Sequence, residues 1–183
     1  MSHRVIEEWR GEEVETLEDL LRPGLRAVCV GINPAPPSVA ADHYYQGKLG
    51  RAFFGRLRRA GLLLAATGWE DDAAFAAGIG FTDIVKRPTS SASEITADEL
   101  AYGKAIVVSK LEAVRPKIVV FTFKKTATVI FGSIAGYGFV GKRLAGGEVF
   151  VMPRPYERAD RGARRAPAAV ETEPAGVKQR SQS

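Results

Sequence analysis

The stretch Ala27-Val28-Cys29-Val30-Gly31-Ile32-Asn33-Pro34-Ala35-Pro36-Pro37-Ser38 decides the fold that this sequence predicts. Its apolar part, Ala27 to Ile32, has the length of a buried strand. The Asn33-Pro34 pair ends that strand, because proline has no N–H to donate and disfavours helix at the residue before it. Ligand crevices in open α/β sheets lie outside the carboxyl ends of strands. Asn33 is therefore a candidate site residue, and an asparagine that merely starts a turn is the alternative.

Three further apolar runs predict strands, and segments with helical spacing separate them. The strands are expected over 80–85, 117–123 and 148–152, and the helices over 51–63, 70–77, 97–114 and 125–131. Thr96 and Glu99 have the spacing of a capping box at the start of the third helix. Short, continuous apolar strands that alternate with helices indicate a parallel sheet covered on both faces.

Three other regions complete the prediction. Val14, Leu17, Leu20 and Leu21 have helical spacing, so a helix is expected over 12–21. Residues 34–50 are expected to form one long loop, and loops of that length are often functional. The five glycines of 136–147 predict a loop or a hairpin.

Polar residues follow the predicted strands at their carboxyl ends. They are Asn33, the segment Lys86-Arg87-Pro88-Thr89 and the segment Arg154-Pro155-Tyr156. Because the carboxyl ends of parallel strands meet at one edge of a sheet, these residues are expected to build one site.

Composition narrows the class of protein. The 183 residues suit one domain with a substantial core, and the formal charge of +5 weakly favours a polyanionic partner. No apolar run is long enough to span a membrane. The lone Cys29 lies in an apolar strand, which predicts a core residue, excludes an internal disulfide and is typical of a reducing cytoplasm. No cysteine and histidine cluster with metal-ligand spacing is present.

Several motifs occur in an order that resembles a known family. They are Gly31-Ile32-Asn33-Pro34, the loop with its aromatic residues, the Phe53-Phe54 helix, Gly80-Phe81-Thr82-Asp83-Ile84-Val85 and Arg87-Pro88-Thr89. Together, over roughly residues 27–160, they resemble the mismatch-specific uracil/thymine-DNA glycosylases of the uracil-DNA glycosylase superfamily. The resemblance implies a three-layer α/β/α sandwich with a central four-stranded parallel sheet.

The resemblance also implies an activity. A monofunctional enzyme of this family flips a mismatched or damaged pyrimidine out of the duplex and hydrolyses its N-glycosidic bond, leaving an abasic site. The implied partner is double-stranded DNA with a G:U or G:T mismatch or a damaged base. The enzyme is expected to be a monomer, to need no metal or cofactor, and to act in the cytoplasm at the bacterial nucleoid.

Individual residues take their expected roles from the family's motifs. Asn33 matches the catalytic asparagine, whose side-chain carbonyl holds the attacking water. Tyr45, or its neighbour Tyr44, is expected to stack on the base, and the small Ala35 leaves room for the methyl group of thymine. The pocket for the base is expected to comprise Ile32, Ala35, Tyr45 and Tyr44. Contacts with DNA are expected from Ser38, Arg87, Thr89, Arg154, Tyr156 and Arg158.

The sequence departs from the family's pattern after the fourth strand. Where the family has Asn-Pro-Ser, then a glycine and an apolar wedge, this chain has Arg154-Pro155-Tyr156 followed by Glu157-Arg158. Arg158 therefore stands at the wedge position. From residue 161 onward no helical apolar stripe is present, whereas the family has a final helix. A domain over 1–160 and a basic, disordered tail over 161–183 are predicted.

Two other functions are considered. A non-catalytic or divergent DNA-binding member of the same fold is favoured by the altered motif and the missing helix, whereas the retained Asn33 and Tyr45 oppose it. A small nucleotide-binding protein is disfavoured, because no Gly-x-Gly-x-x-Gly or Gly-Lys-Ser/Thr loop follows a strand. Asp42 and His43 could form an acid–base pair, but adjacent loop residues need not face one site.

Overall fold

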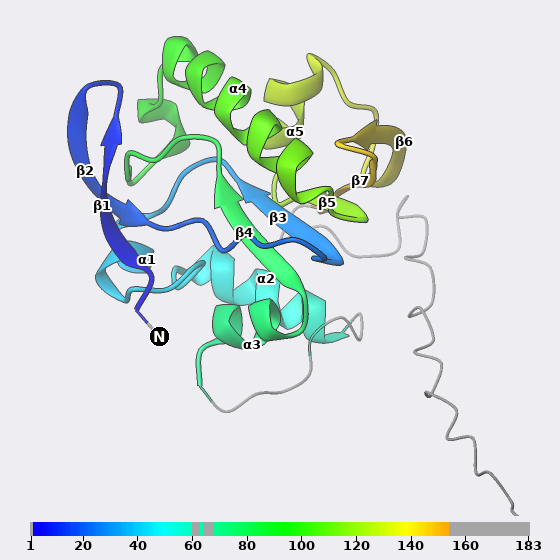
Figure 1. Cartoon of the computed structure of the whole chain (residues 1–183), viewed down its shortest axis with the longest axis horizontal. Coiled ribbons are helices and arrows are strands. Elements are labelled where there is room, and N and C mark those ends of the chain that lie inside the picture. Colours follow the sequence, from blue (N-terminus) through cyan, green and yellow to red (C-terminus); the bar gives the residue numbers. More distant parts are fainter. Residues whose placement is uncertain (1, 60–62, 64–67, 154–183) are drawn as a thin grey trace, which may run out of the picture.

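The computed structural model describes residues 2–59, 63 and 68–153. Its main sheet has five strands in the order β4-β3-β5-β7-β6 (Figure 1). The parallel strands are β3 (Ala27–Gly31), β4 (Ile79–Asp83), β5 (Ile118–Phe121) and β7 (Gly147–Val151), and β6 (Gly138–Leu144) pairs antiparallel with β7. The predicted parallel sheet of four strands is confirmed, and an antiparallel edge strand is added to it.

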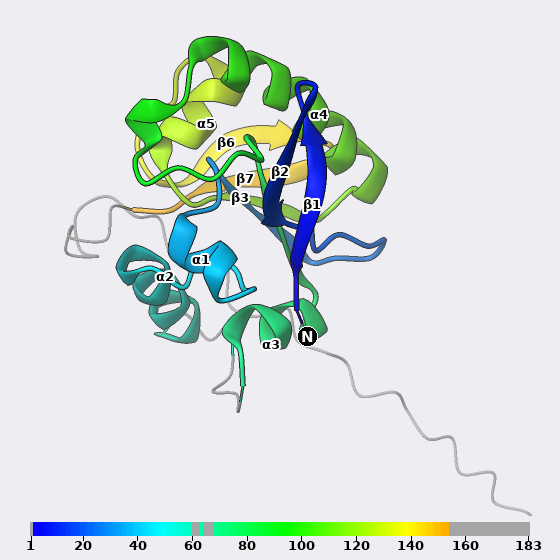
Figure 2. The ribbon, with the colours of Figure 1, turned by 90° about the vertical axis from the view of Figure 1, so that its left-hand side faces the viewer.

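Helices cover both faces of the sheet, so the predicted three-layer sandwich is also confirmed. α4 (Ala97–Val114) and α5 (Lys124–Phe131) lie on one face, and α2 (Lys48–Arg59) and α3 (Glu70–Ala76) lie on the other (Figures 1 and 2). The short α1 (Pro36–Ala40) follows β3, and the 3-10 turn η1 (Ala92–Glu94) precedes α4. Among the helices that the structure describes, none is both long and apolar enough to cross a bilayer.

The apolar runs fill both faces of the sheet because alternate side chains of a strand point in opposite directions. Along β3, Val28 and Val30 belong to the hydrophobic cluster that includes α4 and α5, whereas Cys29 belongs to the cluster that includes α2 and α3. In β5, Phe121 and Val120 divide in the same way. Cys29 is buried, as predicted, and burial raises the pKa of its thiol.

Helix α4 begins at the predicted capping box. Thr96 Oγ1 accepts a hydrogen bond from the Glu99 backbone N–H at 3.2 Å, and Glu99 Oε2 accepts one from the Thr96 backbone N–H at 3.0 Å. The two side chains thus satisfy two backbone donors that a helix start leaves without partners.

The predicted helix over 12–21 is wrong, because this region belongs to a β-hairpin. β1 (Arg4–Trp9) and β2 (Glu12–Leu17) pair antiparallel in a sheet of their own. Arg10 and Gly11 connect them with φ angles of 56° and 86°. Two successive residues in the left-handed region are the geometry of a tight hairpin turn.

Contacts with distant residues hold this hairpin and the segment after it. Thr16 Oγ1 donates to the Lys86 carbonyl at 2.7 Å, and the backbone of Leu20 pairs with Phe81 of β4 at 2.9 and 3.1 Å. The apolar residues whose spacing suggested a helix therefore lie in extended segments, and they contact the rest of the domain from there.

The predicted loop over 34–50 is only partly a loop. Pro36 and Pro37 occupy the first positions of α1, where a missing N–H and a fixed φ are tolerated. Helix α2 begins at Lys48, earlier than predicted. Residues 41–47 connect the two helices. The prediction of a loop or hairpin over 136–147 is confirmed as a hairpin, because β6 and β7 pair there.

Gly103 allows a test of how closely α4 packs on the sheet. A Cβ atom at this position would lie 1.8 Å from the Ile84 carbonyl oxygen and 3.0 Å from the Trp9 ring. We expect Gly103→Ala to lower the free energy of unfolding by about 1–3 kcal/mol, because α4 must move away from the sheet.

Gly55 in α2 is the matched control, because a Cβ atom there would have nothing within 4 Å. Gly55→Ala should raise stability by up to about 1 kcal/mol through helix propensity alone. Urea denaturation measures both variants, and equal midpoints would contradict the close packing of α4.

Candidate active site

A pocket of about 340 Å³ opens at the carboxyl ends of the four parallel strands. The loops after these strands and the start of α2 form its walls. The lining residues include Gly31, Ile32, Asn33, Ala35, Ser38, Tyr45, Lys48, Phe53, Arg56, Asp83, Thr89, Thr122, Phe123 and Met152. The loops after β3 and β4 therefore meet at one edge of the sheet, as the sequence predicted.

Asn33, the only asparagine of the chain, is held by its amide nitrogen. Its Nδ2 donates to the Pro34 carbonyl at 3.1 Å, the Arg87 carbonyl at 3.2 Å and Thr89 Oγ1 at 2.9 Å. Carbonyl oxygens can only accept hydrogen bonds, so these contacts determine which end of the amide is nitrogen. Oδ1 is therefore the acceptor end of the amide of this pocket-lining residue.

The loop after β4 is itself fixed by hydrogen bonds. Thr89 Oγ1 donates to the Ser91 carbonyl at 2.8 Å, which leaves a lone pair for the Asn33 amide. The Arg87 guanidinium makes a bidentate contact with Glu99 at 2.8 and 2.9 Å, and this contact lowers the Glu99 pKa to about 2. Arg87 thus supports Asn33 through its backbone carbonyl. The contacts of Arg87 and Thr89 with DNA stay predictions.

Asp83 is a pocket residue that sequence reasoning did not single out. It pairs with Gly31 in the parallel ladder, and its side chain is buried against the pocket. In the part of the chain that the structure describes, its Oδ1 has no hydrogen-bond partner. Burial raises its pKa to about 7, although the charge of Lys86 opposes the shift. A carboxyl group that titrates near neutral pH is suited to accept a proton.

Gly31 provides the space that Asp83 occupies. A Cβ atom at Gly31 would lie 2.0 Å from Asp83 Oδ1 and 3.3 Å from the Tyr45 hydroxyl oxygen. Both polar atoms are buried. Any side chain at position 31 would therefore displace the carboxyl group, so the glycine of the Gly31-Ile32-Asn33-Pro34 motif is needed for close packing.

Both neighbouring tyrosines line the pocket, but their contacts differ. Tyr45 lines the pocket, and its ring contacts the rings of Phe53 and Phe81 with centroids 5.1 and 5.7 Å apart. Tyr44 is 1% exposed, and its hydroxyl donates to the Glu18 carbonyl at 2.9 Å. The core packing of Tyr44 favours Tyr45 as the ring that meets the base, and stacking by either tyrosine stays a prediction.

The other predicted residues divide between the pocket, the interior and the undescribed part of the chain. Ile32 and Ala35 line the pocket. Ser38 also lines it, but it is buried and its Oγ accepts a hydrogen bond from the Gln46 backbone N–H at 3.1 Å. A contact of Ser38 with DNA stays a prediction. Arg154, Tyr156, Arg158 and the predicted tail over 161–183 lie outside the described residues.

Asp42 and His43 do not form an acid–base pair. Asp42 forms an ion pair with Arg4 at 2.8 Å, and His43 Nδ1 contacts Asp71 Oδ1 at 2.9 Å. Neither residue lines the pocket. Adjacent loop positions here direct their side chains to different partners, away from Asn33.

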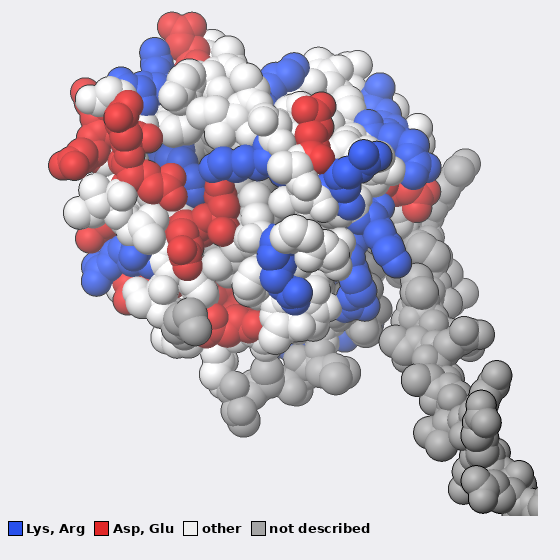
Figure 3. All heavy atoms as spheres, in the orientation of Figure 1, with Lys and Arg blue, Asp and Glu red and all other residues white. Residues whose placement is uncertain are grey.

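Charge is unevenly distributed over the face that Figure 3 shows. Acidic side chains gather over the β1–β2 hairpin, and basic side chains gather toward β6 and β7. At the pocket, Lys48 and Arg56 of α2 are the cationic lining residues. The charge of the α2 residues at the pocket is therefore more favourable to an anion than the charge over the hairpin.

Comparison with known proteins gives one finding. The family model described as the uracil DNA glycosylase superfamily matches residues 18–171. The matched span includes all four parallel strands and both Asn33 and Asp83.

The raised pKa of Asp83 predicts an effect on stability. The folded protein keeps a proton on Asp83 up to about pH 7, whereas the unfolded chain loses it near the ordinary value of 3.8. The folded state thus binds more protons in this window, and stability falls as pH rises through it. Asparagine does not ionise, so Asp83→Asn should not show this fall in stability. The difference between the Tm of the variant and the Tm of the wild type should therefore increase by several degrees from pH 5 to pH 8.

Asp98→Asn is the control for this prediction, because Asp98 is exposed in the first turn of α4. Its difference in Tm should stay constant with pH. Thermal denaturation followed by circular dichroism measures all three proteins. A constant difference for Asp83→Asn as well would show that Asp83 is ionised in the folded protein well below pH 7.

Proposed function

The chain belongs to the uracil DNA glycosylase superfamily, whose members are DNA glycosylases, and on that premise we propose that it excises uracil or thymine paired with guanine. The proposed reaction is hydrolysis of the N-glycosidic bond with water as the nucleophile. It leaves an abasic site and an intact DNA backbone. The observation that carries the proposal is the anchored amide of Asn33 at the pocket.

The fixed orientation of Asn33 suits the binding of a water molecule. The N–H groups of the amide are used in contacts with three acceptors, so the carbonyl Oδ1 is the atom that can accept a hydrogen bond from water. A water held in this way is oriented before the substrate arrives, which lowers the entropic cost of the attack. An amide is too weak a base to take the proton, so another group must do so.

We assign the role of the base to the Asp83 carboxylate. Gly31 pairs with Asp83 and precedes Asn33 by two residues, and all three line the same pocket. As the water oxygen bonds to the anomeric carbon, its proton passes to Asp83, and the electrons of the glycosidic bond leave with the base. With a pKa of about 7, a substantial fraction of Asp83 is ionised at neutral pH.

The walls of the pocket favour a pyrimidine. Tyr45 and Phe123 offer aromatic surface for stacking, which is worth about 1–3 kcal/mol per base. Ala35 has no large side chain to exclude the methyl group of thymine. These features support both uracil and thymine as substrates.

A duplex with a G:U or G:T mismatch is the proposed partner. A glycosylase must extrude its target from the stack, and a mismatched base costs less to extrude than a paired one. We propose that Lys48 and Arg56, which line the pocket, contact phosphates beside the extruded nucleotide. We propose that the protein acts as a monomer in the cytoplasm.

Asn33→Ala should lower the single-turnover rate of base release by about 10²-fold or more, because the water is no longer positioned. Affinity for a G:U duplex should change little. Quenched reactions with alkaline cleavage of the abasic product measure the rate, and fluorescence anisotropy measures binding. If Asn33→Ala released the base at the wild-type rate, Asn33 would have no role in catalysis and would only start the turn after β3.

Thr89 provides a graded version of the same test. Thr89→Val removes the hydroxyl that accepts from the Asn33 amide, whereas Thr89→Ser keeps it. We expect Thr89→Val to slow base release and Thr89→Ser to stay near the wild-type rate.

Asp83→Asn should slow base release by roughly 10²-fold or more at pH 8 and abolish the pH dependence. In the wild-type enzyme the single-turnover rate should rise with pH and level off above about pH 7, because the carboxylate is the active form. Rates between pH 5 and pH 9 measure this profile, with Asp98→Asn as the control. A wild-type rate that is independent of pH would exclude Asp83 as the base.

A non-catalytic DNA-binding member of the superfamily is the second candidate, and the altered residues after β7 favour it. The same assay distinguishes the two functions. Tight binding of mismatched DNA without release of any base by the wild-type protein would establish the second.

A further inference from the structure

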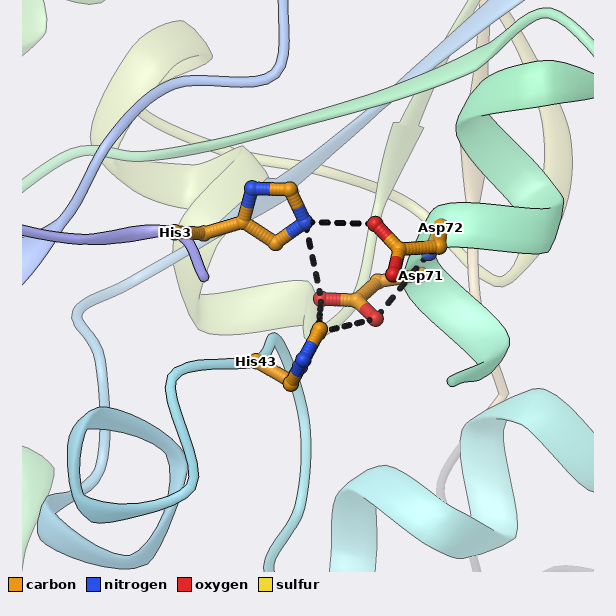
Figure 4. A group of neighbouring side chains, drawn as sticks. All are labelled: His3, His43, Asp71 and Asp72. Carbon is orange, nitrogen blue, oxygen red and sulfur yellow. Dashed lines mark hydrogen bonds and ion pairs between the residues drawn. The ribbon is translucent and has the colours of Figure 1, made fainter. Parts of the chain in front are cut away.

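We propose that His3, His43, Asp71 and Asp72 form a binding site for Zn²⁺ outside the pocket (Figure 4). The four side chains come from three separate segments: the residue before β1, the loop after α1, and the first turn of α3. Their potential ligand atoms all lie within 4.8 Å of one another. His3 and His43 are the only histidines of the chain, so the fold gathers every imidazole that it has at one point.

The distances fit four ligands around one ion. His3 Nε2 lies 2.8 Å from Asp72 Oδ1 and 4.0 Å from Asp71 Oδ2, and His43 Nδ1 lies 2.9 Å from Asp71 Oδ1. Tetrahedral zinc with bonds of about 2.0–2.1 Å separates its ligand atoms by about 3.3 Å. The observed separations lie on both sides of this value, so small side-chain rotations would bring all four atoms to it.

The ligands are buried and carry the right charge. His3, His43 and Asp71 are each at most 3% exposed. Two neutral imidazoles and two carboxylates have a combined charge of −2, which a divalent cation neutralises. Nitrogen and carboxylate ligands in equal number are typical of zinc, whereas magnesium and calcium prefer oxygen ligands alone.

Surrounding contacts orient the ligands, as outer groups do in known zinc sites. His3 Nδ1, on the far side of the ring from the proposed ion, contacts Glu18 Oε1 at 3.3 Å. The Asp71 carboxylate accepts hydrogen bonds from the Tyr44 and Asp72 backbone N–H groups at 2.7 and 3.0 Å. The His43 ring stacks on Trp69 with centroids 4.2 Å apart.

The site would stabilise the loop that carries Tyr45. His43 is two residues before Tyr45 in the 41–47 loop, and an ion bound to it would attach this loop to α3 and to the start of β1. The ion would not touch Asn33 or Asp83, so its role is structural. The proposal therefore does not depend on the reaction at the pocket.

Titration of the full-length, untagged, metal-free protein with Zn²⁺ tests the proposal. We expect binding of one equivalent, a higher Tm, and no response to Mg²⁺. Co²⁺ should bind in place of Zn²⁺ and give the intense visible absorption of a tetrahedral complex. NMR of the imidazole groups should show both histidine rings shifting on addition of one equivalent. No binding, or binding that leaves either ring unshifted, would overturn the proposal and leave a hydrogen-bonded histidine–aspartate cluster.

Variants locate the ion. Asp72→Asn is the mildest change of a ligand, because this side chain is 35% exposed, and it should weaken Zn²⁺ affinity by more than about 100-fold. Glu18→Gln changes the outer contact of His3 and should weaken it by roughly 10-fold. Asp98→Asn, on α4, is the control and should bind as the wild type does. Unchanged affinity in Asp72→Asn would place the ion elsewhere and refute the site. The NMR result on the wild-type protein decides the question if a variant does not fold.

Discussion

The pocket depends on the parallel pairing of β3 with β4 in one register, which sets Gly31 beside Asp83. Side chains alternate along a strand, so a shift of one residue would turn Asp83 to the opposite face of the sheet. The ladder continues past the strands, because the Ile84 and Val85 N–H groups donate to the Gly31 and Ile32 carbonyls at 3.1 and 2.9 Å. The hydrogen bonds of the Asn33 amide extend this pairing into the two loops.

The same pairing imposes a cost on stability. A buried carboxyl oxygen without a hydrogen-bond donor, as Asp83 Oδ1 is among the described residues, opposes folding, and Asp83 reduces the penalty by staying protonated until near neutral pH. Lys86, buried nearby, is bonded to Asp19 at 2.8 Å and to the Leu17 carbonyl at 2.7 Å. Its charge favours ionisation of Asp83 without contacting it. The burial of apolar side chains on both faces of the sheet offsets the unfavourable burial of the Asp83 carboxyl.

The loop between α1 and α2 is held by contacts with several parts of the domain. His43 contacts Asp71, Tyr44 is anchored in the core through its hydroxyl, and the Gln46 N–H binds Ser38. Because its neighbours are fixed in this way, Tyr45 is directed to the pocket, with a left-handed φ of 58°. A zinc ion at the proposed site would reinforce an arrangement that the hydrogen bonds already define.

The sequence by itself determined the order of the four parallel strands and of helices α2 to α5, the burial of the sheet on both faces, and the position of Asn33 at a strand end. These features follow from local patterns of apolar residues and prolines, which any segment carries wherever it lies. Only the tertiary structure decided that residues 4–17 form a hairpin, that the Tyr44 hydroxyl binds the Glu18 carbonyl, and that Arg87 binds Glu99. It also brought Asp83 to Gly31, and His3 to His43 and Asp71. Each of these features depends on contacts between segments far apart in the chain. The local pattern of apolar and polar residues does not specify which distant segment a residue will contact.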